Sequence, residues 1–281
     1  MKNFLLIINI LFALSNITAQ VELPRLSPNA TVSQTVGYTN ITVTYCRPGV
    51  KERKVWGELV PYNKVWRTGA NEATTIEFTT DVVVEGNKVP AGKYGLFTIP
   101  TDKEWTIILN KVWNQWGAFN YDSKQDFLRF KVLPLEHPFT ERMMFAFSEL
   151  TDSSTVLNLF WERLNIPIKI KVDVLSQAYE KIKDAIKKSN TDWHTYAQAA
   201  EYCADNKVFL KDALQWINTA IELNKNFFVY YVKAKVLFSM KNYNDALIAI
   251  DKCRQAGSND KDYDSYVTRV DLLESQIKSK L

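Results

Sequence analysis

The sequence contains few of the residues that metal and catalytic sites most often use. Its 281 residues include only two histidines, His137 and His194, which lie far apart along the chain. We expect His137 in a turn, because Pro138 follows it, and His194 at the start of a helix. Zinc sites need three or four converging ligands, a nucleophilic serine or cysteine needs a base within reach, and no glycine-rich phosphate loop is present. The sequence therefore predicts no metal and no cofactor, and it identifies no catalytic residue.

Cysteine is equally scarce. Cys46, Cys203 and Cys253 are an odd number at wide spacing, which excludes a dense disulfide framework. We expect buried thiols that pack as small apolar groups. One disulfide is the alternative, if the chain folds in an oxidising compartment.

The chain also lacks a strong charge of one sign. Its formal net charge is +4, and lysine and arginine form no consecutive block. Nucleic acids and acidic membrane surfaces are therefore poor candidates for partners. Apolar residues make up 46% of the sequence, which is enough for filled cores and argues against disorder.

A single long apolar run is present, at the N-terminus. Lys2 precedes an almost unbroken apolar stretch over residues 4–14, and Ala19 is a small residue at a suitable cleavage point. The stretch is too short for a permanent transmembrane helix. We expect a signal peptide over residues 1–19, cleaved near Ala19, and an exported chain, periplasmic or extracellular, that is not an integral membrane protein. The alternative is a disordered end or a core helix.

Residues 20–173 have the period-two pattern of β-strands. About nine short segments mix β-branched and aromatic residues with polar ones, and turn residues separate them. Gly86-Asn87 has the composition of a two-residue hairpin turn. This pattern predicts an antiparallel β-sandwich or barrel, with Trp105 and Trp161 in its core.

Residues 174–281 have helical periodicity instead. Apolar residues recur on one face of a helix over residues 174–188, and a final helix is expected over residues 262–280. Between them, the segments that begin at Asp212 and Asp245 repeat with their alanines 33 positions apart. This region resembles the tetratricopeptide repeat, and an unrelated helical bundle is the alternative.

The tetratricopeptide resemblance implies a concave surface that holds a protein or peptide partner. In that register Tyr231 and Lys235 lie on the inner side of the second helix pair, together with Phe228 and Phe238. The alternative is that the two phenylalanines pack against the β half.

One segment of the β half, residues 55–74, combines charged, amide and aromatic side chains around glycine and proline breaks. Arg67 beside Trp66 can present a guanidinium over an aromatic plane, and Asn71 and Glu72 add polar groups nearby. These four residues are candidates for a small polar binding site. The alternative is a buried Arg67–Glu72 ion pair that closes the end of the sandwich, with Trp56, Tyr62 and Trp66 in the core.

A second candidate is the expected loop over residues 113–121, which is crowded with aromatic and amide side chains. Trp113 and Trp116 can stack on sugar rings or hold an extended peptide. Burial in the core is the alternative for both. The β half is therefore expected to bind a glycan or another small polar ligand.

The β half resembles a bacterial family of exported proteins known only as domain of unknown function 2911. The matching segments are residues 53–57, 59–62, 65–74, 89–100 and 105–110. The resemblance covers roughly residues 26–172, and members with a helical tail of tetratricopeptide type are similar to the whole chain. It implies fold and export and carries over no catalytic residue.

Three functional hypotheses follow. The first is a non-enzymatic envelope protein that binds a protein, peptide or glycan. The second is a hydrolase with a site around Arg67, Asn71 and Glu72. The third is a structural protein in which the same segment stabilises the fold and the helical tail serves assembly.

Overall fold

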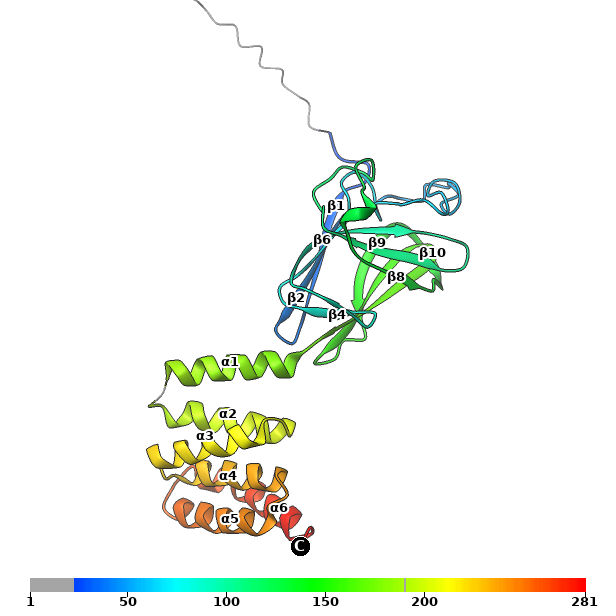
Figure 1. Cartoon of the computed structure of the whole chain (residues 1–281). Coiled ribbons are helices and arrows are strands. Elements are labelled where there is room, and N and C mark those ends of the chain that lie inside the picture. Colours follow the sequence, from blue (N-terminus) through cyan, green and yellow to red (C-terminus); the bar gives the residue numbers. More distant parts are fainter. Residues whose placement is uncertain (1–22, 190) are drawn as a thin grey trace, which may run out of the picture. The chain divides into compact units, whose positions relative to one another are not determined.

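The structure is a computed structural model that describes residues 23–189 and 191–281 (Figure 1). The predicted signal peptide, residues 1–19, lies outside these residues. The chain divides into two compact units, one ending at Ile170 and the other beginning at Lys171. The first consists of antiparallel sheets and the second contains six α-helices, which confirms the predicted order of a β region followed by an α region.

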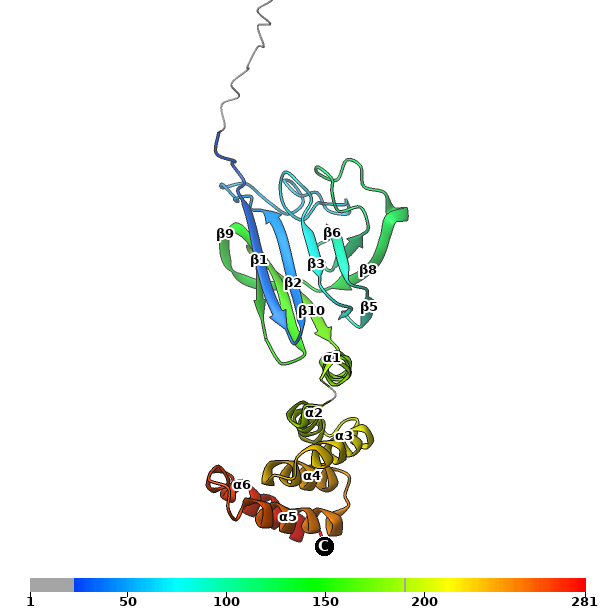
Figure 2. The ribbon, with the colours of Figure 1, turned by 90° about the vertical axis from the view of Figure 1, so that its left-hand side faces the viewer.

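The β unit contains two antiparallel sheets. The larger has the order β1-β2-β3-β6-β7-β8 and the smaller the order β5-β4-β10-β9. Figure 2 shows β1, β2, β3 and β6 side by side in one layer. The larger sheet comprises β1 (Asn29–Val36), β2 (Thr39–Cys46), β3 (Thr75–Phe78), β6 (Gly92–Ile99), β7 (Trp105–Asn110) and β8 (Asp126–Val132). The smaller comprises β4 (Val82–Val84), β5 (Asn87–Val89), β9 (Leu135–Ser148) and β10 (Ser154–Val172).

Aromatic contacts hold the two sheets face to face. Tyr45 on β2 and Phe145 on β9 pack edge to face, with ring centroids 4.9 Å apart. The backbone N–H of Phe145 donates to the hydroxyl of Tyr45 at 3.0 Å. One buried tyrosine thus supplies both packing and a hydrogen bond between the sheets.

Four tryptophans form the centre of this core. The rings of Trp66 and Trp161 are stacked with centroids 5.7 Å apart, and Trp56 meets Trp105 and Trp161 edge-on at 4.8 and 5.5 Å. Trp105 and Trp161 are buried, as predicted, and Trp66 is buried with them. The segment 55–66 therefore crosses the sandwich and closes its core.

Strand β9 lies at the end of the smaller sheet, and the segment after β2 covers its outer edge. The N–H of Met143 donates to the carbonyl of Pro48 at 3.0 Å, and the N–H of Val50 donates to the carbonyl of Glu141 at 2.9 Å. Together with the hydroxyl of Tyr45, these bonds satisfy backbone groups that an edge strand otherwise exposes.

Two local predictions in the β unit are wrong. The hairpin turn is Glu85-Gly86, one residue before the expected position, because Asn87 pairs with Val84 in the ladder. Both turn residues have positive φ, 45° and 82°, as a type I′ turn requires. His137 lies within β9 instead of a turn, since the strand continues through Pro138 at the edge of its sheet.

The α unit begins with α1 (Val174–Lys188), whose bounds match the predicted helix. It continues with α2 (Trp193–Asn206), α3 (Leu210–Leu223), α4 (Phe227–Ser239), α5 (Tyr243–Gly257) and α6 (Val267–Lys278). His194 lies in the first turn of α2, as expected. The repeated alanines, Ala213 on α3 and Ala246 on α5, are fully buried, so helices approach closely at both positions. The final helix is shorter than predicted, because a 3-10 turn over Tyr263–Ser265 precedes it.

The three cysteines are free and buried, as expected. In the described part of the chain, every α-helix is too short or too polar to span a lipid bilayer. The same residues contain no group of three or more histidine, cysteine, aspartate or glutamate side chains placed to hold a metal ion.

Candidate functional site

The segment Trp66–Glu72 is a tight loop that turns on itself. The indole Nε1 of Trp66 donates to the carbonyl of Gly69 at 3.0 Å, and Thr74 Oγ1 donates to the carbonyl of Thr68 at 2.7 Å. Thr68 and Asn71 both have positive φ, 55° and 56°, so the chain reverses twice within a few residues. This local geometry decides where each predicted site residue points.

The predicted Arg67–Glu72 ion pair is wrong. Glu72 instead accepts a hydrogen bond from Arg25 Nη1 at 2.9 Å and one from the thiol of Cys46 at 3.4 Å. The reversal at Asn71 carries Glu72 away from Arg67 and toward the outer face of the larger sheet. Arg67 is half-buried, and burial lowers the pKa of its guanidinium. Its Nε has no hydrogen-bond partner among the described residues.

The Cys46–Glu72 contact does not produce a nucleophile. Burial raises the pKa of the Cys46 thiol, and the neighbouring Glu72 carboxylate raises it further. Burial also raises the pKa of Glu72, but the hydrogen bonds from its own backbone N–H, from Cys46 and from Arg25 outweigh it and hold that pKa below its usual value. At neutral pH the pair is therefore a thiol that donates to a carboxylate, and thiols are poor nucleophiles.

A small cavity of about 210 Å³ opens beside Glu72 on the outer face of the larger sheet. Trp113 forms one wall, and Lys93 Nζ lies 4.5 Å from the centroid of its ring. Backbone hydrogen bonds join the two predicted segments, from Ala73 N to Gln115 O and from Gly117 N to Asn71 O, each 3.0 Å long. The structure thus places two predicted site residues, Glu72 and Trp113, in one cavity.

The other predicted residues of the β unit lie elsewhere. Trp66 is in the core, and Arg67 does not line the small cavity. The side-chain amide of Asn71 donates to the carbonyl of Ser27 at 3.1 Å and anchors the chain before β1. Trp116 is 57% exposed, forms an isolated antiparallel β-bridge with Glu72 and lies outside the cavity lining. The predicted site residues of the β unit therefore lie in the core, in backbone contacts and on the surface, and they do not form a single site.

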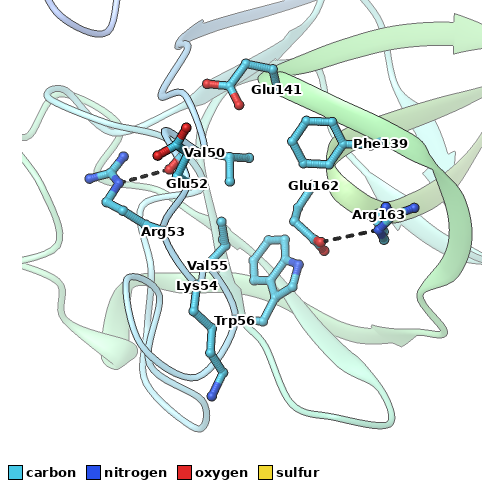
Figure 3. A pocket seen from close by; sticks show the side chains of 10 residues that line it. All are labelled: Val50, Glu52, Arg53, Lys54, Val55, Trp56, Phe139, Glu141, Glu162 and Arg163. Atoms are coloured by element: carbon cyan, nitrogen blue, oxygen red, sulfur yellow. Dashed lines mark hydrogen bonds and ion pairs between the residues drawn. The ribbon is translucent and has the colours of Figure 1, made fainter.

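A larger cavity, of about 640 Å³, lies at β9, β10 and the loop after β2 (Figure 3). We call it the glutamate cavity. Figure 3 shows Phe139 and Glu141 on the strand side, with Val50 and Arg53 on the facing loop. The lining residues are Val50, Glu52, Arg53, Lys54, Val55, Trp56, Phe139, Glu141, Glu162 and Arg163.

A β-bulge aims Glu162 into this cavity. The pairing of β10 with β9 shifts register on both sides of Glu162, and Glu162 has a φ of +56°. Bulges re-aim a side chain out of the strict alternation of a strand. Glu162 Oε1 lies 4.0 Å from Arg163 Nε, so both charges are held at one wall.

The facing loop is rigid and brings an aromatic ring to the cavity. Arg53 donates to the carbonyls of Gly49 at 2.7 Å and Val50 at 3.0 Å, which fixes the loop against its own backbone. Trp56 contributes its ring both to the core and to the cavity wall. Its indole Nε1 is buried and has no acceptor among the described residues. On the opposite wall Phe139 is 51% exposed, and the Arg163 guanidinium lies 5.9 Å from its ring centroid.

The charges that line the glutamate cavity balance. Glu52, Glu141 and Glu162 supply three carboxylates, and Arg53, Lys54 and Arg163 supply three cations. A site with no net charge, two aromatic rings and many donors and acceptors suits a neutral polar ligand.

Sequence reasoning missed this cavity, although one signal was present. Glu162 and Arg163 stand side by side directly after Trp161, in the middle of a long segment rich in apolar residues. Two adjacent charges cannot both face solvent on a regular strand, so they indicate a bulge or a functional position.

In the α unit the two predicted groove residues share one cavity of about 270 Å³. Lys235 Nζ pairs with Glu201 at 2.9 Å and Asp205 at 2.7 Å, and lies 5.6 Å from the ring centroid of Tyr231. Phe228 and Phe238 pack against the core of the helices. The charge of Lys235 is therefore neutralised by α2 before any ligand binds.

Compared with known protein families, residues 27–170 match the family described as "Protein of unknown function (DUF2911)". No curated protein matches the chain.

Proposed function

The chain belongs to this family, whose description assigns no activity, and from that premise we propose that its β domain is a non-enzymatic binding module for a neutral glycan. The glutamate cavity is the proposed site. The balance of three carboxylates and three cations around two aromatic rings is the observation that carries this proposal. Sugars present hydroxyls that both donate and accept, together with an apolar face that stacks on aromatic rings.

The contacts of each wall suggest how a sugar binds. Phe139 is half-exposed and supplies a stacking surface at the mouth. Glu162 accepts from hydroxyl groups, and Arg163 beside it donates. The indole N–H of Trp56 is a further donor at the inner wall. A ligand with net charge is less favoured, because it would leave part of this balanced set unpaired.

We further propose that this binding takes place in the envelope or outside the cell, because residues 1–19 have the composition of a signal peptide. The helical domain is proposed to hold a protein or peptide partner in a tetratricopeptide-like arrangement. The 33-residue spacing of the buried alanines and the cavity at Tyr231 and Lys235 support this second role.

Binding to an array of neutral and acidic oligosaccharides tests the glycan proposal. A neutral oligosaccharide identified on the array is titrated against the full chain by calorimetry. We expect Phe139→Ala to weaken binding roughly three- to tenfold, the equivalent of one lost aromatic contact. Phe119→Ala is the matched control, since Phe119 is 85% exposed and lies outside the cavity. The proposal fails if no neutral oligosaccharide binds, or if the two variants bind equally.

A further inference from the structure

A cavity of about 570 Å³ lies between α3, α4 and α5. It is lined by other residues of α4 than the cavity at Tyr231 and Lys235. Three lysines line it, from three places in the chain: Lys225 between α3 and α4, Lys233 on α4 and Lys252 on α5. We call it the lysine cavity. Its other lining residues are Leu214, Asn218, Ile221, Tyr230, Leu237, Asn242, Asp245, Ile248 and Ala249.

The lysine cavity carries uncompensated positive charge. None of its three lysines forms an ion pair among the described residues, in contrast to Lys235, which has two carboxylate partners. Asp245 is the one acidic group in the lining, and it accepts a hydrogen bond from Asn242 Nδ2 at 2.7 Å. Three cations against one carboxylate leave a surplus that favours an anionic ligand.

Lys233 is the cation held most firmly in this cavity. It is half-buried, and its Nζ donates to Asn218 Oδ1 at 2.8 Å, a neutral partner. Burial lowers the pKa of Lys233, and the nearby cation of Lys252 lowers it further. Asp245 raises this pKa and so opposes both effects only in part, and a ligand carboxylate brought to this point would add further counter-charge that favours the charged lysine.

The lining also distinguishes a peptide from a small anion. The lysines are distributed over a loop and two helices, so they can pair with carboxylates at successive positions of one ligand. Apolar side chains lie between them, including Ile248, which is 53% exposed. A peptide that alternates acidic and apolar side chains can pair with the lysines and contact the apolar lining at the same time.

We propose that the lysine cavity binds an acidic peptide segment, whose carboxylates pair with the three lysines and whose apolar side chains contact Leu214, Ile221 and Ile248. This site is separate from the glycan site of the β domain and from the cavity at Tyr231 and Lys235. The partner is therefore a protein with an exposed acidic and apolar segment.

Fluorescence anisotropy with a labelled peptide of alternating glutamate and leucine tests this proposal on the full chain. The matched probe has glutamine in place of every glutamate. We expect the acidic peptide to bind more tightly and its affinity to fall as salt increases. Lys233→Gln should weaken binding about tenfold, the loss of one charge-assisted hydrogen bond.

Lys211→Gln is the matched control, because Lys211 is exposed on α3 and does not line the cavity. Both variants should keep the wild-type melting temperature, since neither lysine has an ion pair among the described residues. The proposal is overturned if the two peptides bind equally, if neither binds, or if Lys233→Gln binds like the control. Displacement of the peptide by inorganic phosphate at equal concentration would assign the cavity to a small anion instead.

Discussion

Replacing Tyr45 with phenylalanine tests how the two sheets of the β domain are held together. The change removes the hydroxyl that accepts from the buried N–H of Phe145 at 3.0 Å and keeps the ring contact at 4.9 Å. A buried N–H left without an acceptor costs about 1–3 kcal/mol, whereas the retained ring contact contributes about 0.5–1.5 kcal/mol. We therefore expect Tyr45→Phe to lower the free energy of unfolding by about 1–3 kcal/mol.

Removal of the whole side chain should cost more. Tyr45 is only 5% exposed, so Tyr45→Ala also leaves a void between the sheets, and we expect a loss of about 3–5 kcal/mol. Urea unfolding followed by tryptophan fluorescence measures both variants, because the tryptophan cluster lies in this domain. The midpoint should fall while the dependence on urea concentration stays constant.

Amide hydrogen exchange identifies the bond directly. In Tyr45→Phe the Phe145 amide should lose protection by more than its strand neighbours do. Tyr62→Phe is the matched control, since Tyr62 is 37% exposed and should unfold like the wild type. Wild-type stability in Tyr45→Phe, with unchanged protection at Phe145, would refute this account of the contact between the sheets.

The remaining predictions concern a surface pair, a helix end and a phenol. Glu72→Gln should change the melting temperature little, because both side chains of its pair are about half-exposed; a loss as large as that of Tyr45→Ala would contradict this. Gly257→Ala would place its Cβ 2.3 Å from Cγ of Tyr263, so we expect a net loss in thermal unfolding, since overpacking costs about 1–3 kcal/mol and the gain in helix propensity is at most about 1 kcal/mol. Burial, aided by a hydrogen-bonded carboxylate, raises the pKa of Tyr121 from 10.0 to about 12. Because the fold favours the neutral phenol, this stabilisation is complete below pH 10 and is lost as the pH rises to about 12. The difference in unfolding free energy between wild type and Tyr121→Phe should shrink over that range, and a constant difference would contradict the assignment.

The parts of the fold that depend on local signals could be predicted from sequence. The regular apolar face over residues 174–188 predicts the first helix with its observed bounds. In the structure Asp173, directly before it, caps its N-terminus by accepting from the N–H of Ser176 at 3.0 Å. The burial of Trp105 and Trp161 followed from their place in alternating strands. Such signals depend only on neighbours in the sequence.

The candidate sites depend on contacts between distant segments, so they could be predicted only in part. Glu72 pairs with Arg25, which lies 47 residues earlier. The positive φ at Asn71 turns Glu72 away from Arg67. The position of Glu162 depends on a register shift between β9 and β10. No periodicity in a single sequence specifies such a shift, although the two adjacent charges indicate its place.

The cover along β9 has a consequence for self-association. Exposed strand edges recruit strands from other chains, and such recruitment leads to swapped dimers and fibres. Here the N–H of Met143 is already bonded to Pro48 in the segment that follows β2, and the N–H of Phe145 is bonded to the hydroxyl of Tyr45 on β2. At the other end of the same sheet, β5 is only three residues long and offers little ladder to an incoming strand. A partner can therefore gain little by adding a strand to this smaller sheet, since addition is blocked along the covered part of β9 and weak at β5.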